Sequence, residues 1–351
     1  MIHKDQITDF LSKENCDAAF IQKDENVRYI SGFTGSDSYL ILTRGEQYLV
    51  TDSRYTEQAG KEAEGFTVVN HGGKLAETVS RLFHDHHAAR IGVEPVMTYK
   101  MYLSFAERMK DAAFVFCDAD RLRRIKSEEE LQYIAEACRI SDEGFRRIVP
   151  LIQAGRTEVE LRTALECAML EAGSEGKSFD TIAASGWRSA FPHGTATDKV
   201  VEEGDLITFD FGAIYKGYHS DITRTVAVGQ ISDRQRYLYD SVLDCVLYVE
   251  GFMKAGMKAC DVDAKAREFL KQKDLAQYFT HALGHSVGLE IHESPVLAPR
   301  DHSVLGVHMT ETIEPGVYIP GTGGVRIEDT VVIGKDGISI LTKFPKTFLQ
   351  V

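Results

Sequence analysis

Residues 206–228 read LITFDFGAIYKGYHSDITRTVAV and predict two strands joined by a turn at residues 216–218. Asp210 lies inside the first apolar strand, and Asp221 opens the second. A carboxylate is expensive to bury in such a strand unless it is paired or binds a metal ion. A hairpin of this length brings the two aspartates near one another, where they can share ions. A purely structural alternative pairs Asp210 with a basic residue such as Arg224.

Three histidines follow in the segment HALGHSVGLEIHESP, at positions 281, 285 and 292. On a helix His281 and His285 would share one face, because they are four residues apart. The glycines at 284 and 288 instead favour a loop or a strand. A single histidine here would be read as a hydrogen-bonded core residue, but three within twelve positions favour a chemical role.

Residues 312–333, TIEPGVYIPGTGGVRIEDTVVI, predict two strands separated by a glycine-rich turn. Glu314 precedes a Pro-Gly turn, which fixes the backbone direction directly after the carboxylate. Arg326 and Glu328 are two apart on an alternating strand, so their side chains are expected on one face. Two readings follow: a salt bridge between them, or an arginine that orients a metal-bound carboxylate or contacts the substrate.

Together these segments supply an oxygen-rich ligand set with one imidazole: Asp210, Asp221, His285, Glu314 and Glu328. Such a set suits two hard or borderline divalent cations better than one zinc ion. Four converging carboxylates would repel each other strongly without metal, whereas two divalent ions balance their charge. The pattern predicts a dinuclear metallohydrolase. Upstream, the segment ASGWRSAFPHGTAT places His193 between Pro192 and Gly194, in a loop.

The domain organisation follows from length and from a capping signal. A chain of 351 residues predicts two domains. The first ~115 residues alternate short β-rich runs with helical stretches, which predicts an α/β domain with a mixed sheet and a hairpin around Arg44 and Gly45. Ser127 and Glu130 form a capping box that opens a helix at about 128–148. We therefore expect domains at residues 1–121 and 122–351, with further helices near 157–172, 233–254 and 261–272.

Bulk properties exclude several function classes. A net charge of −13 argues against nucleic acid or an anionic membrane surface as the main partner. No apolar run approaches the roughly 20 residues that cross a bilayer, and the first residues lack the apolar core of a secretory signal. The six scattered cysteines indicate reduced thiols. These features predict a cytoplasmic protein.

The chain resembles the prolidase and aminopeptidase P group of the pita-bread metallopeptidase superfamily. The matching segments are ASGWRSAFPHGT, FDFGAIYKGYHSDITRT, HALGHSVGLEIHE, TIEPGVYIPG and GVRIEDT, with YISGFTGS and VTDSRYTEQA in the N-terminal part. The resemblance implies an α+β chain, with a smaller N-terminal creatinase-like α/β domain and a C-terminal pita-bread catalytic domain. The expected activity is hydrolysis of the bond between an N-terminal residue and a following proline.

The resemblance also implies roles for the residues above. Five would hold two divalent ions, manganese first with cobalt or zinc as alternatives, and Asp221 and Glu328 would bridge them. His193, His281, His292 and Arg326 fall on substrate-binding and transition-state positions, and Glu314 is the expected proton acceptor. The partners are short peptides with proline second, and a homodimer is expected. Ser286 departs from the pattern, since relatives commonly have glycine there.

Several alternatives remain open. An Xaa-Pro dipeptidase restricted to dipeptides is the nearest rival to an Xaa-Pro aminopeptidase. A methionine aminopeptidase usually lacks the extra N-terminal domain, and a creatinase-like amidinohydrolase would not retain all five ligands. A non-catalytic peptide-binding protein of the same fold would lack ligands. The sequence does not decide the native metal, the preferred first residue or the peptide pool.

Overall fold

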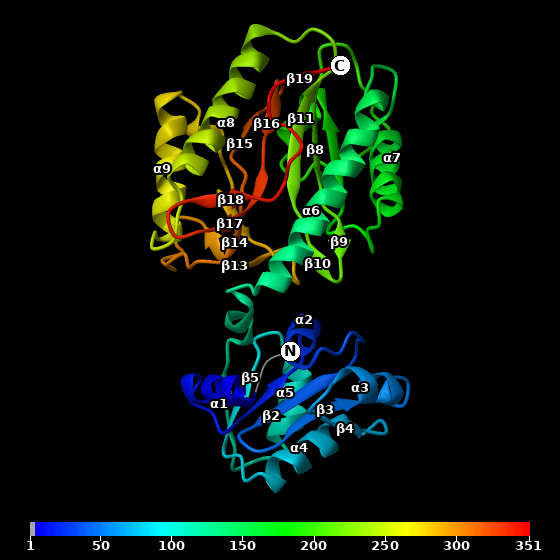
Figure 1. The fold of residues 1–351 in the computed structure, drawn as a ribbon, viewed down its shortest axis with the longest axis vertical. Helices are drawn as coiled ribbons and strands as arrows, with labels where there is room; N and C mark the ends of the chain where they lie inside the picture. Colours follow the sequence, from blue (N-terminus) through cyan, green and yellow to red (C-terminus); the bar gives the residue numbers. More distant parts are fainter. Residues whose placement is uncertain (1–3) are drawn as a thin grey trace. The chain divides into compact units, whose positions relative to one another are not determined.

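The computed structural model describes residues 4–351, which divide into two units, one up to Arg123 and one from Arg124 onward (Figure 1). Each unit has its own hydrophobic cores. None of the helices in this described part of the chain combines the length and the apolar composition needed to span a bilayer.

A six-stranded mixed sheet organises the first unit, in the order β4-β3-β2-β1-β5-β6. Strands β1, β2 and β3 pair antiparallel, whereas β1–β5, β3–β4 and β5–β6 pair parallel, so the predicted mixed sheet and the hairpin around Gly45 are confirmed. The strands are β1 (Ala18–Ile21), β2 (Tyr39–Thr43), β3 (Gln47–Thr51), β4 (Thr67–Asn70), β5 (Arg90–Val93) and β6 (Ala113–Phe116).

Helices pack apolar side chains against both faces of this sheet, which gives two buried clusters. The sequence pattern did not reveal α1 or α2, which are short helices with a narrow apolar stripe such as Ile7, Phe10 and Leu11. The helices are α1 (Lys4–Lys13), α2 (Asp24–Ser31), α3 (Thr56–Glu62), α4 (Leu75–Asp85), α5 (Tyr99–Ala106) and the 3₁₀ turn η1 (Ala119–Arg123).

The second unit consists of two halves, each with a pair of helices against antiparallel strands (Figure 1). In the first half α6 (Glu128–Ile148) and α7 (Glu158–Glu171) pack with β7 (Ile182–Ser185), β8 (Leu206–Phe211) and β11 (Ile222–Ala227). In the second half α8 (Asp233–Phe252) and α9 (Ala259–Gln272) pack with β13 (Glu293–Leu297), β14 (Thr310–Ile313), β15 (Gly316–Ile319), β16 (Gly323–Arg326) and β17 (Asp329–Ile333).

Short elements complete this unit. They are η2 (Val149–Leu151), η3 (Gly186–Ala190), β9 (Ile214–Tyr215), β10 (Tyr218–His219), η4 (Ala276–Tyr278), β12 (Gly284–Ser286), β18 (Ile338–Ile340) and β19 (Leu349–Gln350). Strands β9 and β10 form the predicted turn inside residues 206–228, and β8 pairs antiparallel with β11 on either side of it.

Helix starts follow the local sequence closely. Ser127 Oγ accepts a hydrogen bond from Glu130 N, and the Glu130 carboxylate accepts one from Ser127 N, so the predicted capping box opens α6 at its predicted position. An apolar stripe runs along α6, with Ile134, Cys138 and Phe145 fully buried. The same reciprocal cap opens α7 and α8.

The prediction of two strands separated by a turn within residues 312–333 is wrong, because this stretch is divided among four strands, β14, β15, β16 and β17. Strand β16 ends at Arg326 and β17 begins at Asp329, and they belong to different sheets. Ile327 and Glu328 form the step between them. Glu328 N donates to Thr223 O of β11 at 3.1 Å, so this step lies against the first half of the unit.

Candidate metal centre and active site

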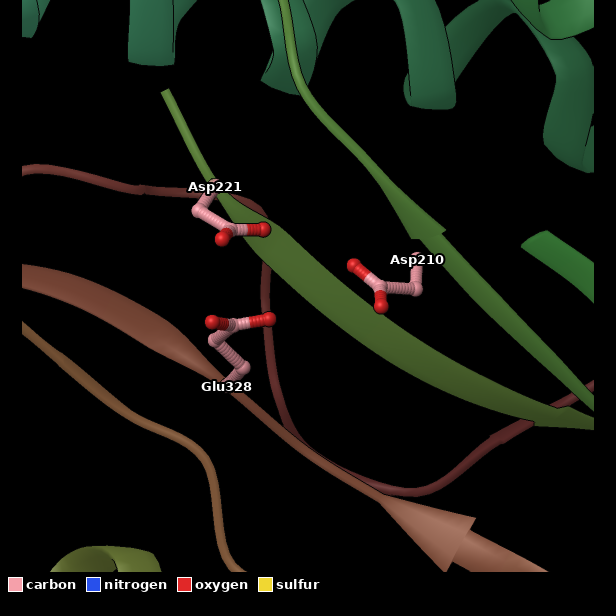
Figure 2. Close-up of side chains that lie close together, drawn as sticks. All are labelled: Asp210, Asp221 and Glu328. Carbon is pink, nitrogen blue, oxygen red and sulfur yellow. The ribbon is translucent and has the colours of Figure 1, made fainter. Parts of the chain in front are cut away.

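Three carboxylates from both halves of the second unit meet at one point (Figure 2). Asp210 lies in β8, Asp221 directly precedes β11, and Glu328 lies between β16 and β17. The β8–β11 register places Asp210 opposite Thr223, two residues after Asp221. One carboxylate oxygen from each of the three lies within 4.8 Å of the others. The predicted convergence of the two aspartates is therefore present in the structure.

Glu314 and His285 extend this cluster from the second half. Glu314 follows β14, and its backbone N donates to Leu283 O at 2.8 Å. His285 Nε2 lies 3.5 Å from Asp221 Oδ2 and 3.5 Å from Glu314 Oε1. His285 Nδ1 lies 3.1 Å from Ser286 O, a carbonyl that can only accept, so the ring proton belongs on Nδ1. The lone pair of Nε2 then faces the carboxylates, as in a histidine that ligates a metal.

The glycines at 284 and 288 correctly favoured extended structure over a helix, since His285 lies in β12. Ser286, the residue that departs from the family pattern, is fully buried, and its Oγ lies 3.3 Å from Lys126 Nζ. The β12–β13 register shifts between His285 and Ser286, so the strand is irregular at this step.

The electrostatics of the cluster require positive charge. Burial and the Glu328 carboxylate hold the pKa of Asp221 well above its usual range, and burial and Glu314 do the same for Glu328. Burial, with Asp210 adding to it, raises the pKa of Glu314 to about 8. Burial and the neighbouring His292 lower the pKa of His285 to about 4, so its ring is neutral. Four acidic groups thus face a neutral imidazole.

Two carboxylate oxygens in the cluster are buried and have no hydrogen-bond partner within residues 4–351, Asp210 Oδ1 and Asp221 Oδ1. A buried unpartnered carboxylate oxygen is costly unless a cation meets it. Oxygen donors with one neutral imidazole nitrogen are the ligands that divalent ions such as manganese accept. The residues present therefore fit a divalent metal centre.

Arg326 links Asp210 to two residues that face the same site. Its Nη2 donates to Asp210 Oδ2 at 2.6 Å, and its Nη1 donates to the Tyr318 hydroxyl at 2.7 Å. The Tyr318 oxygen lies 2.8 Å from His281 Nε2, while His281 Nδ1 lies 2.7 Å from Ala282 O. Since that carbonyl accepts, His281 Nδ1 carries the proton and Nε2 accepts from Tyr318. Burial and the Arg326 charge lower the pKa of His281 to about 4.

One of the two salt-bridge alternatives that the sequence left open is confirmed in part: Asp210 pairs with a basic residue, but with Arg326 and not with Arg224. The other, a pair between Arg326 and Glu328, is wrong. Arg224 does not pair with Asp210: its Nη2 donates to Asp329 Oδ1 at 2.8 Å. Arg326 pairs with Asp210 rather than with Glu328. The strand step at residues 327–328 removes the face that Arg326 and Glu328 were expected to share. The β8–β11 register sets Thr223 opposite Asp210, so the next residue, Arg224, lies on the other face.

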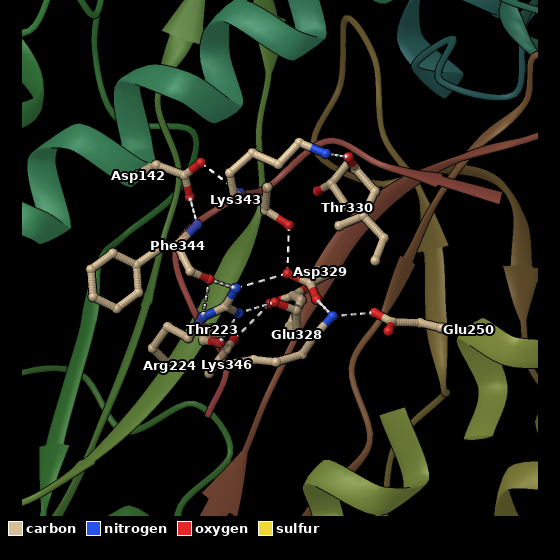
Figure 3. Close-up of polar contacts among 12 residues, drawn as sticks. Asp142, Thr223, Arg224, Glu250, Glu328, Asp329, Thr330, Lys343, Phe344 and Lys346 are labelled. Carbon is tan, nitrogen blue, oxygen red and sulfur yellow. Dashed lines mark hydrogen bonds and ion pairs between the residues drawn. The ribbon is translucent and has the colours of Figure 1, made fainter. Parts of the chain in front are cut away.

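A buried network of charged groups holds the segment that bears Glu328 (Figure 3). Arg224 Nη1 donates to the Glu328 carbonyl and to Thr223 O, so one guanidinium ties β11 to the strand step. Lys346 Nζ pairs with both Asp329 and Glu250. Although burial alone raises it, Arg224 and Lys346 hold the pKa of Asp329 below its usual range. This network holds the backbone at Glu328 in place and thereby positions the Glu328 carboxylate.

A cavity of about 470 Å³ adjoins the cluster. Its lining includes all nine predicted site residues: His193, Asp210, Asp221, His281, His285, His292, Glu314, Arg326 and Glu328. Apolar side chains form part of the wall, among them Phe179, Ile182, Ile291 and Val296. The His292 ring lies against that of His285, with centroids 4.4 Å apart. Within residues 4–351, hydrogen bonds engage both ring nitrogens of His281, but none engages the rings of His193 and His292.

Tyr318 is the site residue that the sequence reading missed. It is buried and joins Arg326 to His281. The β15–β16 register pairs Gly316 with Arg326 and Tyr318 with Gly324, so Tyr318 is the diagonal neighbour of Arg326. A hairpin register counted from the Gly-rich turn at residues 321–324 would have indicated this contact.

Comparison with known proteins identifies the class. Residues 132–335 match the model of Metallopeptidase family M24, and residues 4–125 match that of the Creatinase/Prolidase N-terminal domain. The chain belongs to metallopeptidase family M24, and it is a peptidase hydrolase with the pita-bread fold and a creatinase-like N-terminal domain. The predicted fold class, family and enzyme class are confirmed.

Several relatives in this family are named for a peptidase activity. An Xaa-Pro dipeptidase of Pyrococcus furiosus is 38% identical over 98% of this chain and 99% of its own. The solved structure of an Xaa-Pro dipeptidase from Bacillus anthracis superimposes with a TM-score of 0.96 at 39% identity, covering 99% of each chain. That of an X-Pro aminopeptidase from Thermotoga maritima gives a TM-score of 0.89 at 38% identity, covering 97% of this chain and 99% of its own.

Proposed function

We propose that this protein is an Xaa-Pro peptidase that requires two divalent metal ions and cleaves after the N-terminal residue. One observation carries the proposal: Asp210, Asp221, Glu314 and Glu328 converge with His285 Nε2 beside a cavity, and two of their buried oxygens have no partner within the described residues. Family membership implies divalent ions. The names of the relatives supply the preference for proline.

Five residues would hold the ions: Asp210, Asp221, His285, Glu314 and Glu328. By the family resemblance, Asp221 and Glu328 would be shared between the two ions, and burial raises the pKa of both carboxylates. When bound, the ions would supply Lewis-acid activation of a water molecule and of the scissile carbonyl. Manganese is our first candidate, and cobalt and zinc are the alternatives that reconstitution would separate.

Proton transfer would fall to Glu314. Its Oε1 accepts from Thr312 Oγ1 at 3.2 Å and faces His285, which leaves Oε2 to take a proton from the attacking water. Without cations, burial raises the pKa of Glu314 to about 8. Bound cations would favour the ionised carboxylate, which is the form that accepts a proton.

The histidines would bind and orient the substrate. His193 and His292 line the cavity, and no described group forms a hydrogen bond with their ring nitrogens, so both can donate to a substrate carbonyl or to a developing oxyanion. His281 would act through Tyr318, since both of its ring nitrogens are engaged. Arg326 would orient Asp210 through the 2.6 Å ion pair.

Two substrate classes remain candidates. A dipeptidase must hold a free C-terminal carboxylate beside the proline. Among the described residues that line the cavity, Arg326 is committed to Asp210, Tyr318 and Pro192 O, and no lysine is present. His193 and His292 also line the cavity and could hold that carboxylate, so the lining accommodates both classes, and we take an Xaa-Pro aminopeptidase as the first candidate. The dipeptidase names of relatives such as that of P. furiosus favour Xaa-Pro dipeptides as the second candidate.

Turnover of Ala-Pro and of Ala-Pro-Ala by the manganese-loaded protein separates the two, with Ala-Ala-Ala as the control for the proline requirement. An aminopeptidase releases alanine from Ala-Pro-Ala with the higher kcat/KM. Activity confined to Ala-Pro would identify a dipeptidase. No hydrolysis of any of them would favour the non-catalytic alternative and contradict the proposal.

We also propose a homodimer. Light scattering of the metal-loaded protein should give about twice the 39.1 kDa mass of one chain. A single species at the mass of one chain under assay conditions would contradict this assembly.

A further inference from the structure

Glu158, at the start of α7, is a fully buried carboxylate outside the metal cluster. It accepts hydrogen bonds from five donors. Its Oε1 accepts from Ser185 N at 2.8 Å and from Ser185 Oγ at 2.9 Å. Its Oε2 accepts from Thr197 N at 3.0 Å, from Thr197 Oγ1 at 2.9 Å and from Arg188 Nη1. All five donors belong to the segment 185–197.

This segment carries two groups that face the cavity. His193 and Pro192 both line it, and Pro192 O accepts from Arg326 Nη1 at 3.2 Å. Glu158 binds the first and the last residue of the segment, and Arg188 extends the contact by donating to Thr195 O at 2.9 Å. The middle of the segment is also tied to β16, because Gly324 N donates to Ser189 Oγ at 2.8 Å.

We propose that Glu158 is a positioning residue for the peptidase reaction, which acts by holding both ends of segment 185–197 and thereby placing His193 against the substrate. The inference rests on the proposed function, because it assumes that His193 acts on the substrate. A carboxylate at position 158 suits these donors better than an amide would. A carboxylate has two acceptor oxygens, which share the five donors, whereas an amide offers one acceptor oxygen and adds two N–H donors that meet other donors.

The alternative is that Glu158 only stabilises the fold. A double-mutant cycle distinguishes the two, because a residue that acts through His193 loses its kinetic effect once His193 is absent. The cycle uses Glu158→Gln, His193→Ala and the double variant, all manganese-loaded, with Ala-Pro-Ala and Ala-Pro as substrates. Melting temperature is measured for each, so that a loss of stability is separated from a loss of positioning.

We expect Glu158→Gln to lower kcat/KM about tenfold or more in the wild-type background and less than about twofold in the His193→Ala background. The change in melting temperature should be the same in both backgrounds. Glu160→Gln is the matched control, since Glu160 is exposed on the same helix turn and caps the helix without contacting segment 185–197. Its kcat/KM should equal that of the wild type.

Three results would overturn the proposal: no kinetic effect of Glu158→Gln, an equal loss in both backgrounds, or full activity of His193→Ala. The last result would refute the role of His193 in the proposed function, whereas the first two refute positioning alone. If Glu158→Gln does not fold, Thr197→Val removes one of the five donors with little change in shape. Thr197→Val should lower kcat/KM by a smaller factor, and this effect should again disappear in the His193→Ala background. A loss of kcat/KM that persists in that background would contradict positioning.

Discussion

Arg326 Nη2 donates to Asp210 Oδ2 at 2.6 Å, while Asp210 Oδ1 is buried without a partner in the described part of the chain. One oxygen of the aspartate is thus committed to the arginine, and the other is left facing the acidic cluster. Arg326 fixes the orientation of the carboxylate without neutralising the other acidic groups. This relationship explains how a site rich in carboxylates can be rigid and still retain its need for cations.

We expect Arg326→Lys to lower kcat/KM about 10- to 100-fold, because loss of a partner that orients a ligand typically has this effect. The charge is kept, but one ammonium cannot reproduce the separate bonds to Asp210, Tyr318 and Thr223. Steady-state kinetics and a manganese titration measure the effect. Wild-type kcat/KM together with wild-type metal affinity would show that the ion pair does not orient Asp210.

Tyr318→Phe should lower kcat/KM about tenfold and stability by about 1–2 kcal/mol, since it removes the hydroxyl between Arg326 and His281. Tyr239→Phe is the matched control: that buried hydroxyl donates to Lys346 O at 3.1 Å, and Tyr239 does not line the cavity. The control should lose comparable stability with unchanged kcat/KM. Equal kinetic losses in both variants would assign the effect to general destabilisation.

Asp221→Asn and Glu328→Gln should abolish peptidase activity and preserve the fold, as measured by turnover and circular dichroism. Each change also relieves repulsion, so the metal-free variants should melt at a higher temperature than the metal-free wild type. Asp142→Asn, which alters a buried carboxylate bonded to Lys343 N and Phe344 N, serves as the control and should retain activity. Full activity of Asp221→Asn or Glu328→Gln would falsify the bridging roles.

Glu250 gives the protein a pH dependence separate from the metal site. Burial, together with the nearby Asp329 carboxylate, raises the pKa of Glu250 from 4.5 to about 7, although the hydrogen bond from Lys346 acts to lower it. A group whose pKa is raised on folding contributes stability below its unfolded pKa and loses that contribution as pH rises through its folded pKa. Between about pH 5 and pH 8, the wild type should therefore lose about 2 kcal/mol of unfolding free energy relative to Glu250→Gln.

Denaturant unfolding at the two pH values measures this difference. The pH dependence that the metal cluster contributes cancels in the comparison, because both proteins contain the cluster. Glu268→Gln is the control, since its side chain is 59% exposed on α9. A constant difference between wild type and Glu250→Gln across the range would show that the Glu250 pKa is not raised.

The sequence predicted those features that depend on neighbouring residues. The capping box at Ser127 and Glu130 set the start of α6, and the Lys216–Gly217 turn set the hairpin that separates Asp210 from Asp221. Metal-ligand chemistry and family resemblance then selected the nine residues that the structure places around one cavity. The boundary between residues 121 and 122, and the role of each of the nine, stay predictions.

Features that depend on pairing between distant segments were not predictable in this way. The strand step at Glu328 sets the partner of Arg326, and the β8–β11 register keeps Arg224 away from Asp210. Alternation within residues 323–333 reveals neither. The five hydrogen bonds to Glu158 join a helix start to a loop some thirty residues later, and no local pattern indicates them. Tyr318 required the β15–β16 register.

Metal stoichiometry tests the central claim most directly. The purified chain is stripped with a chelator, titrated with manganese at neutral pH by calorimetry, and analysed for bound metal after removal of free ions. We predict close to two ions per chain, with a melting temperature that rises on binding, and about one or fewer for Glu328→Gln. Fewer than one ion per wild-type chain would contradict the account.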